Sequence, residues 1–301
     1  MTPAQGPGNG LVVAAHGRHC MVETADGSRL LCHGRGKKSE VVVGDRVHWQ
    51  PAGDAGVVDR VAERRNLLFR QDEWKSKSFA ANLDQLLVLV AVEPMYAETQ
   101  LARALIAAES AGIATTIVLN KTDLPTLAAA RERLAPYRAM GVAVLELSLK
   151  AQGEAAAAAL QPLLQGKATL VLGPSGMGKS TLINLMVPAA AAQVGEISKA
   201  LNAGRHTTTS TSWYWLDASR QSALIDSPGF QEFGLRQLKA TDLPGLMPDL
   251  RPHADACRFY NCSHLHEPGC GVRAAVEAGA IHPSRYRIYG ELHAELSATR
   301  Y

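Results

Sequence analysis

The sequence of 301 residues has no long apolar run, little net charge and few cysteines, and each shortage excludes a class of protein. No apolar stretch approaches the roughly 18 residues needed to span a bilayer, so we predict a soluble chain with no membrane partner. The N-terminus, MTPAQGPGNG, lacks the basic start and apolar run of a secretory signal. We therefore expect a cytoplasmic location, where the five cysteines stay reduced. A net charge of +3 does not by itself indicate nucleic-acid binding.

The first 70 residues predict a tail and a small β-barrel. Residues 1–10 are rich in proline and glycine, which is typical of a frayed terminus. Over 11–70, five short apolar stretches alternate with turn signals such as Asp26-Gly27 and Gly44-Asp45, a spacing that favours an all-β barrel of the OB type. Basic residues in the turns would suit a nucleic-acid backbone, but acidic residues are nearly as numerous, so an ordinary solvated surface remains equally open.

The middle of the chain predicts a doubly wound α/β sheet. Residues 66–81 are mixed and polar and suit a linker to a buried strand over 83–92. Strands alternating with helices of ordinary length indicate a largely parallel sheet. We predict helices over 96–111, 127–140 and 151–165, the last interrupted near Pro162, and strands over 114–119, 143–147, 169–172, 212–216 and 223–225.

A glycine-rich turn follows the strand at 169–172 and leads into a helix at 181–186. Gly173, Gly178, Lys179 and Ser180 satisfy G-x-x-x-x-G-K-[ST], in which backbone N–H groups surround a polyphosphate at the positive end of a helix. Lys179 can then neutralise β/γ oxygens and Ser180 can hold Mg²⁺. A turn that binds nothing is the alternative, and the complete pattern argues against it. The predicted phosphate-binding residues are Gly173, Pro174, Ser175, Gly176, Met177, Gly178, Lys179, Ser180 and Thr181.

A second motif, Asn-Lys-Thr-Asp, directly follows the strand at 114–119 and is similar to the guanine-specificity motif of GTPases. A carboxylate at Asp123 can accept hydrogens from the guanine ring N–H and exocyclic amine, whereas adenine presents a bare acceptor. Four residues alone could also be a polar strand-end loop. The loop after the next strand looks like a variant of the one whose backbone approaches the guanine carbonyl. The predicted base-binding residues are Asn120, Lys121, Thr122, Asp123, Ser148, Leu149 and Lys150.

The segment Asp226-Ser227-Pro228-Gly229 resembles a Walker-B and switch II element. Asp226 would hold Mg²⁺ through water, and the Gly229 amide would sense a γ-phosphate. A hydroxyl from the run Thr207-Thr208-Thr209 would reach the ion, and we select Thr208. Alone, these segments could be a hydrophilic loop and a turn.

The order of the motifs is unusual, because the Asn-Lys-x-Asp motif lies upstream of Gly173. A circular permutation restores the usual sheet, since domain termini lie close together. The chain then leaves the domain just beyond Gly229, so whatever follows is tied to a loop that orders with the γ-phosphate.

Three cysteines and a histidine lie within fourteen residues near the C-terminus: Cys257, Cys262, His264 and Cys270. Four soft ligands in a reduced compartment suit a closed, structural, tetrahedral Zn²⁺. His253 and His266 are competing ligands, and buried cysteines without metal are the alternative. Zinc can supply ~10–16 kcal/mol toward folding a region with so small a core. Residues 272–299 then read as helices.

Taken together, NKTD, GPSGMGKSTLIN, GRHTTT, DSPGF and CRFYNCSHLHEPGC resemble the circularly permuted, ribosome small-subunit-dependent GTPase A family. The resemblance covers nearly the whole chain and implies three domains: an OB-fold barrel over 11–70, a permuted P-loop GTPase domain over 71–240 and a mostly α-helical zinc-binding domain over 241–301. A longer basic N-terminal extension found in some relatives is short and uncharged here.

The resemblance also implies a function. The protein would be a monomeric GTP hydrolase using GTP/GDP, Mg²⁺ and one structural Zn²⁺, and it would act in late assembly of the 30S ribosomal subunit. The subunit would stimulate hydrolysis, and the protein would bind its rRNA. An ATP-dependent phosphoryl-transfer enzyme and a nucleotide-independent RNA-binding module are the alternatives from other functional classes.

Phe230 stands where Ras-like enzymes carry the glutamine that orients the attacking water. The resemblance favours His206 as its substitute, with Gln231 as runner-up and an ordinary loop histidine as the alternative. His206, Lys179 and Thr208 are thus the predicted catalytic residues. We predict slow intrinsic hydrolysis, with a partner ordering the segment that holds His206.

Overall fold

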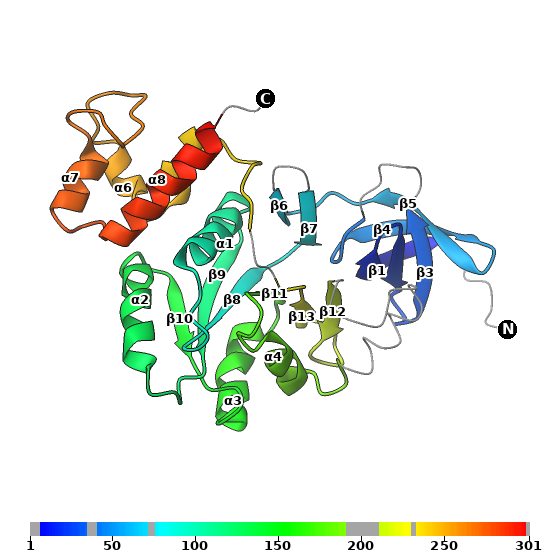
Figure 1. Cartoon of the computed structure of the whole chain (residues 1–301). Coiled ribbons are helices and arrows are strands. Elements are labelled where there is room, and N and C mark those ends of the chain that lie inside the picture. Colours follow the sequence, from blue (N-terminus) through cyan, green and yellow to red (C-terminus); the bar gives the residue numbers. More distant parts are fainter. Residues whose placement is uncertain (1–6, 35–40, 72–75, 191–210, 230–232, 299–301) are drawn as a thin grey trace.

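The computed structural model describes residues 7–34, 41–71, 76–190, 211–229 and 233–298. The predicted catalytic residues His206 and Thr208 lie outside these ranges, as do Phe230 and Gln231. Along the chain follow a small β-barrel, an α/β layer and a helical C-terminal region, with the barrel and the C-terminal region at opposite ends of the molecule (Figure 1).

Five short strands close the N-terminal barrel, as predicted. They pair in the order β1-β2-β3-β5-β4, and β4 pairs again with β1. Alternate side chains point inward and form a separate apolar core that includes Val12, Cys32 and Trp49. The strands are β1 (Gly8–His16), β2 (His19–Glu23), β3 (Arg29–Gly34), β4 (Arg46–Ala52) and β5 (Ala55–Val61).

The start of β1 corrects the prediction of a tail through residue 10. Gly8, Asn9 and Gly10 pair with β4 and so belong to the barrel. Gly10 has a steric reason to be glycine, because a Cβ there would lie 2.3 Å from the Val22 side chain and 2.9 Å from the Glu23 carbonyl oxygen.

A two-stranded hairpin occupies the segment expected to be a linker. It consists of β6 (Leu67–Gln71) and β7 (Ser76–Ala81). Leu68 and Phe79 are buried, and the Phe79 ring stacks on Phe233 with centroids 5.6 Å apart. These apolar contacts hold the hairpin against the α/β layer, whereas its polar residues had suggested a linker.

Five parallel strands form the centre of the α/β layer in the order β10-β9-β8-β11-β13, and β12 is antiparallel to β13. All seven residues of β8 are buried, as expected for a central strand. The strands are β8 (Gln85–Ala91), β9 (Ala114–Asn120), β10 (Ala143–Glu146), β11 (Ala168–Leu172), β12 (Ser212–Trp215) and β13 (Ala223–Asp226), and the helices are α1 (Glu98–Ser110), α2 (Leu127–Ala139), α3 (Gly153–Leu164) and α4 (Lys179–Met186).

Helix α3 is continuous, so the interruption predicted near Pro162 is wrong. Pro162 lies in the last turn of the helix, two residues before its end at Leu164. A proline so close to the C-terminus removes one backbone hydrogen bond without breaking a long helix in two.

The sheet continues beyond the α/β layer. Strand β12 pairs with β1 through Ala14 and Ser212, so a single eleven-stranded sheet runs from β10 into the barrel. Beside this junction, the buried Glu23 carboxylate accepts hydrogen bonds from Trp215 Nε1 at 2.7 Å and Arg29 Nε at 2.9 Å. Barrel and α/β layer are therefore joined by backbone pairing and by buried polar contacts.

The C-terminal region contains η1 (Ala240–Leu246), α6 (Arg251–Ala254), α7 (Gly271–Glu277) and α8 (Pro283–Ser297). Arg285 on α8 is buried, donates to both oxygens of Asp249 at 2.8 and 3.1 Å, and lies 5.1 Å from the ring centroid of Tyr137 on α2. The ion pair joins parts of the C-terminal region, and the contact with Tyr137 fastens the region to the α/β layer. Within the described ranges, no helix has the length and apolar character needed to cross a membrane.

Candidate nucleotide and metal sites

The loop between β11 and α4 has the strand, turn and helix that the phosphate-binding motif requires. Gly178 has a φ of +106°, and a Cβ there would lie 2.3 Å from Asn120 Nδ2. At Gly173, a Cβ would lie 2.3 Å from the Leu89 carbonyl oxygen. Both positions therefore need glycine, because a Cβ at either one would clash with a residue of a neighbouring strand. Gly178 needs it also for its positive φ.

Lys179 is the first residue of α4, and its ammonium lies within the loop. Nζ donates to the carbonyl oxygens of Gly173 at 2.7 Å and Pro174 at 2.8 Å. Burial lowers the pKa of Lys179, while the Asp226 carboxylate opposes that shift. Because its partners are neutral carbonyls, the cation retains strong attraction for an anion entering the loop.

Asp226 ends β13 beside the phosphate-binding loop. Burial raises its pKa to about 6, although the Lys179 ammonium and the Ser227 N–H favour the charged form. Ser227 Oγ donates to the Val171 carbonyl oxygen at 2.7 Å, which fixes the turn to β11. The Asp226 carboxylate and the Ser180 hydroxyl line the same cavity and are the hard oxygen donors that Mg²⁺ prefers, so the residues present fit this ion.

The Asn-Lys-x-Asp motif begins at the last residue of β9 and contacts the loops that follow β10 and β11. Asn120 Nδ2 donates to the Met177 carbonyl oxygen at 2.9 Å, and Asn120 Oδ1 accepts from the Leu149 N–H at 3.0 Å. Ser148 Oγ donates to Asp123 Oδ1. Asn120 thus locks the phosphate-binding loop to both predicted base-binding segments.

One cavity of about 830 Å³ collects most of the predicted nucleotide residues. It places Asp123 and Lys179 in the same hollow, although they come from segments more than fifty residues apart in a shuffled order. The predicted residues that line it are Asn120, Lys121, Asp123, Ser148, Leu149, Lys150, Ser175, Gly176, Gly178, Lys179, Ser180, Thr181, Asp226 and Gly229.

Of the predicted nucleotide-binding residues that the structure describes, four do not line the cavity: Thr122, Gly173, Pro174 and Met177. Three of them supply backbone carbonyls, since Gly173 and Pro174 accept from Lys179 and Met177 accepts from Asn120. Leu124 and Ser227 line the cavity and were missed. Leu124 directly follows Asp123, and Ser227 directly follows Asp226, so their position next to a motif aspartate could have identified them.

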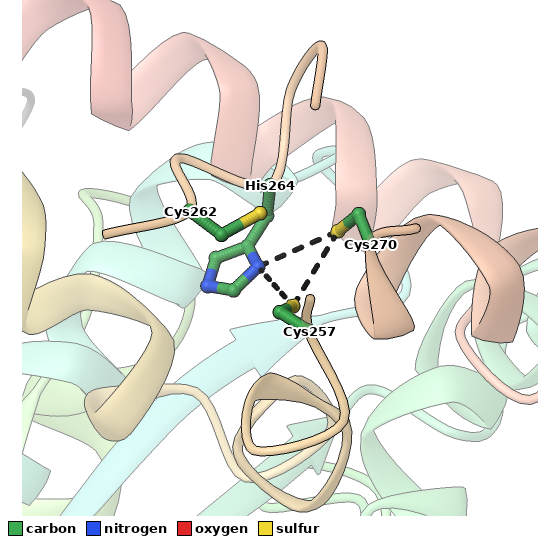
Figure 2. Close-up of side chains that lie close together, drawn as sticks. All are labelled: Cys257, Cys262, His264 and Cys270. Atoms are coloured by element: carbon green, nitrogen blue, oxygen red, sulfur yellow. Dashed lines mark hydrogen bonds between the residues drawn. The ribbon is translucent and has the colours of Figure 1, made fainter. Parts of the chain in front are cut away.

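The Cys257, Cys262, His264 and Cys270 side chains point toward one another from the loop between α6 and α7 and from the start of α7 (Figure 2). Their ligand atoms all lie within 4.8 Å of one another. Cys257 Sγ is 3.8 Å from Cys270 Sγ and 3.3 Å from His264 Nδ1, and Cys270 Sγ is 3.5 Å from the same nitrogen. A tetrahedral Zn²⁺ would separate two sulfurs by about 3.8 Å and a sulfur from a nitrogen by about 3.5 Å. The donor set therefore fits zinc.

The surroundings of the cluster suit a structural metal. The Gly271 N–H donates to Cys257 Sγ at 3.3 Å, and the Arg273 N–H donates to Cys270 Sγ at 3.5 Å, as thiolates require. Burial lowers the pKa of His264, which favours the neutral imidazole that binds metal. The two histidines considered as competing ligands, His253 and His266, are not in the cluster, and His266 is exposed.

The fold and the cavity define a P-loop nucleotide-binding protein whose sheet strands are threaded in permuted order. The RsgA GTPase family model matches residues 61–236. The chain belongs to the RsgA GTPase family, and it is a GTP-hydrolysing enzyme rather than the ATP-dependent enzyme that the phosphate loop alone left open.

Relatives support this assignment over the whole chain. The small ribosomal subunit biogenesis GTPase RsgA of Variovorax paradoxus is 62% identical, covering 100% of this chain and 98% of that protein. The protein of the same name from Burkholderia pseudomallei strain K96243 is 56% identical over 96% of this chain and 92% of its own.

Solved structures share the fold. The crystal structure of YjeQ from Thermotoga maritima has a TM-score of 0.73 at 30% identity, covering 98% of this chain and 100% of its own. That of YloQ, a circularly permuted GTPase, has a TM-score of 0.71 at 27% identity over 100% and 99%. The predicted permutation and fold class are thereby confirmed.

Proposed function

We propose that this GTPase is a switch in late assembly of the small (30S) ribosomal subunit, that the subunit stimulates its hydrolysis, and that it binds rRNA. The names of its relatives link them to small-subunit biogenesis. The observation that carries the nucleotide part is the cavity that holds Asp123 and Lys179 together. We further propose that the protein acts in the cytoplasm as a monomer.

In this proposal GTP lies with its base near Asp123 and its phosphates in the loop before α4. The Asp123 carboxylate accepts from the guanine ring N–H and amine, and the Asn120 contacts keep the base and phosphate segments in register. Lys179 exchanges its two carbonyl partners for β/γ oxygens. Ser180, Asp226 and Thr208 would hold Mg²⁺, which neutralises charge on the triphosphate.

The roles of His206 and Thr208 rest on the family resemblance, since both lie outside the described residues. With Phe230 in the position of the usual glutamine, the side chain that orients water must come from elsewhere. His206→Ala should therefore reduce subunit-stimulated turnover, and Gln231→Ala is the matched comparison. Unchanged stimulated turnover in His206→Ala would remove this histidine from the mechanism.

The test of the proposal is GTP hydrolysis with and without purified 30S subunits at two salt concentrations. The protein alone should turn over slowly, subunits should accelerate it, and the acceleration should shrink at higher salt because phosphate contacts release counterions. Turnover that is indifferent to subunits at both salt concentrations would overturn the switch. Subunit binding that is equal with GDP and a non-hydrolysable GTP analogue would instead favour a nucleotide-independent RNA-binding module.

A further inference from the structure

Two neighbouring aromatic side chains in the metal-cluster loop face solvent. Tyr260 is fully exposed and Phe259 is 40% exposed, and among the described residues the only other exposed large apolar side chain is Met95. An aromatic ring that is left in water contributes nothing to folding through burial. Adjacent exposed aromatics are instead typical of contact sites.

The loop presents these rings from a rigid base. Phe259 and Tyr260 are two of the four residues between the cluster residues Cys257 and Cys262. The Arg258 N–H donates to the Gly269 carbonyl oxygen at 3.0 Å, and the Cys262 N–H donates to the Phe259 carbonyl oxygen at 3.2 Å. Because the backbone is already fixed, binding through the rings would lose little conformational entropy.

The chemistry beside the rings favours a nucleic acid over an apolar protein surface. The Arg258 guanidinium lies over the Phe259 ring, 5.5 Å from its centroid. Across the described ranges, Arg258 has no carboxylate within ion-pair distance, while the loop's own Glu267 is occupied by the Ser263 and His266 N–H groups. The flanking residues are Arg258 and Asn261, both exposed and polar, rather than aliphatic.

We propose that Phe259 and Tyr260, backed by Arg258, form a stacking site for unpaired nucleobases of RNA. Aromatic faces stack on any base, and an unpaired guanidinium adds attraction to both the base and the phosphates. The loop lies at the end of the molecule opposite the barrel (Figure 1), so the site is a second RNA contact far from any made by the barrel. The inference rests on the proposed ribosomal function for the identity of the RNA.

The experiment measures binding of the full chain, loaded with a non-hydrolysable GTP analogue, to 30S subunits. Phe259→Ala and Tyr260→Ala should each weaken binding by roughly 5- to 100-fold, as expected for the loss of one base stack. Tyr260→Phe keeps the ring and should bind like the wild type. Met95→Ala, which removes an exposed apolar side chain elsewhere, should change nothing. Zinc content and GTP hydrolysis without subunits should be unaltered in all four variants.

Other outcomes overturn the proposal in distinguishable ways. Wild-type affinity in the Phe259→Ala, Tyr260→Ala double variant removes the site while leaving the switch intact. A loss in Tyr260→Phe equal to that in Tyr260→Ala replaces stacking with a hydroxyl contact. A photoreactive aromatic at position 260 should crosslink to rRNA, and a crosslink to a ribosomal protein instead assigns the surface to a protein partner. Failure of the wild-type protein to bind subunits at all overturns both this inference and the proposed function.

Discussion

Asp226 is a buried carboxylate whose charge opposes folding of the nucleotide-free protein. Its pKa of about 6 exceeds the unfolded value of 3.8, so the folded state disfavours the ionised form. The destabilisation is complete above pH 6 and fades as the pH falls toward 3.8. A buried carboxylate of this kind lowers the stability of the ligand-free protein but is suited to binding a cation.

Asp226→Asn should therefore raise the free energy of unfolding of the nucleotide-free protein by ~3 kcal/mol at pH 7.5, with the gain shrinking toward pH 4. Denaturant unfolding at several pH values measures this. Asp54→Asn, at an exposed position in the barrel, is the control and should show no such trend. A variant that is less stable than the wild type at pH 7.5 would contradict the account.

Asp123 determines the base in the proposed complex. Ser148 Oγ holds one of its oxygens, which orients the carboxylate toward the cavity. Asp123→Asn should weaken GDP binding by about 100-fold and favour xanthine nucleotides, because the amide donates to the carbonyl that xanthine carries in place of the guanine amine. Competition between guanine, xanthine and adenine nucleotides measures the change. Equal loss for all three would indicate a damaged pocket rather than altered specificity.

Most of the nucleotide site was predictable at the residue scale because each motif follows a strand that is recognisable from its apolar run. Asn120 was expected at a strand end, and the structure places it there. Its bridging of Met177 and Leu149 was not predictable, since both partners are backbone groups that no sequence pattern marks. The hydrogen bonds from Lys179 to the Gly173 and Pro174 carbonyl oxygens were not predictable for the same reason.

At the scale of elements, the segment after β13 is held from three sides. The Gln71 carbonyl oxygen in β6 accepts from the Arg236 N–H at 3.0 Å, and Phe79 in β7 stacks on Phe233. Arg103 on α1 donates to the Phe233 carbonyl oxygen and pairs with Glu295 on α8. The hairpin and the C-terminal helix are thus both fastened to residues that directly follow the predicted switch.

Arg103→Ala should lower the free energy of unfolding by about 2–3 kcal/mol, because it leaves Glu295 and a backbone carbonyl without their mostly buried partner. Arg287→Ala is the matched control, since Arg287 forms an exposed pair with Glu291 on the same helix α8. Its loss should cost at most about 0.5 kcal/mol. Chemical denaturation of both variants tests the difference. A similar loss of the free energy of unfolding in both would show that the Arg103 contact stabilises the fold no more than an exposed ion pair.

The elements that sequence reasoning missed share a cause. The sequence between β6 and β7, Asp72-Glu73-Trp74-Lys75, has no glycine, proline or asparagine to indicate a hairpin. The hairpin packs through Phe79 on Phe233, which is more than 150 residues away in the chain. Local composition therefore indicated a linker, whereas a tertiary contact decided the structure.

For the molecule as a whole, Glu23 is a polar contact that couples barrel and α/β layer. It is buried, and it binds Trp215 from β12, Arg29 from β3 and, at 3.7 Å, Arg220 from the turn after β12. The contact was not predictable from the sequence, because nearly 200 residues separate Glu23 from Trp215 and Arg220. Through it, β12, the strand that follows the run Thr207-Thr208-Thr209, is attached to the barrel.

Glu23→Ala should lower the free energy of unfolding by about 2–4 kcal/mol and separate the unfolding of the barrel from that of the α/β layer. Calorimetry should then show two transitions where the wild type shows one. Glu63→Ala, which removes an exposed carboxylate just after β5, should leave the profile unchanged. One undivided transition in Glu23→Ala would mean that backbone pairing alone holds the two parts together.

The pairing of β12 with β1 has a further consequence for how this chain can be dissected. A fragment cut after the barrel would leave the backbone of β12 unpaired on its outer side, next to Trp213 and Trp215. Uncovered strands of this kind recruit other chains. A GTPase fragment prepared without the barrel should therefore oligomerise more readily than the intact protein.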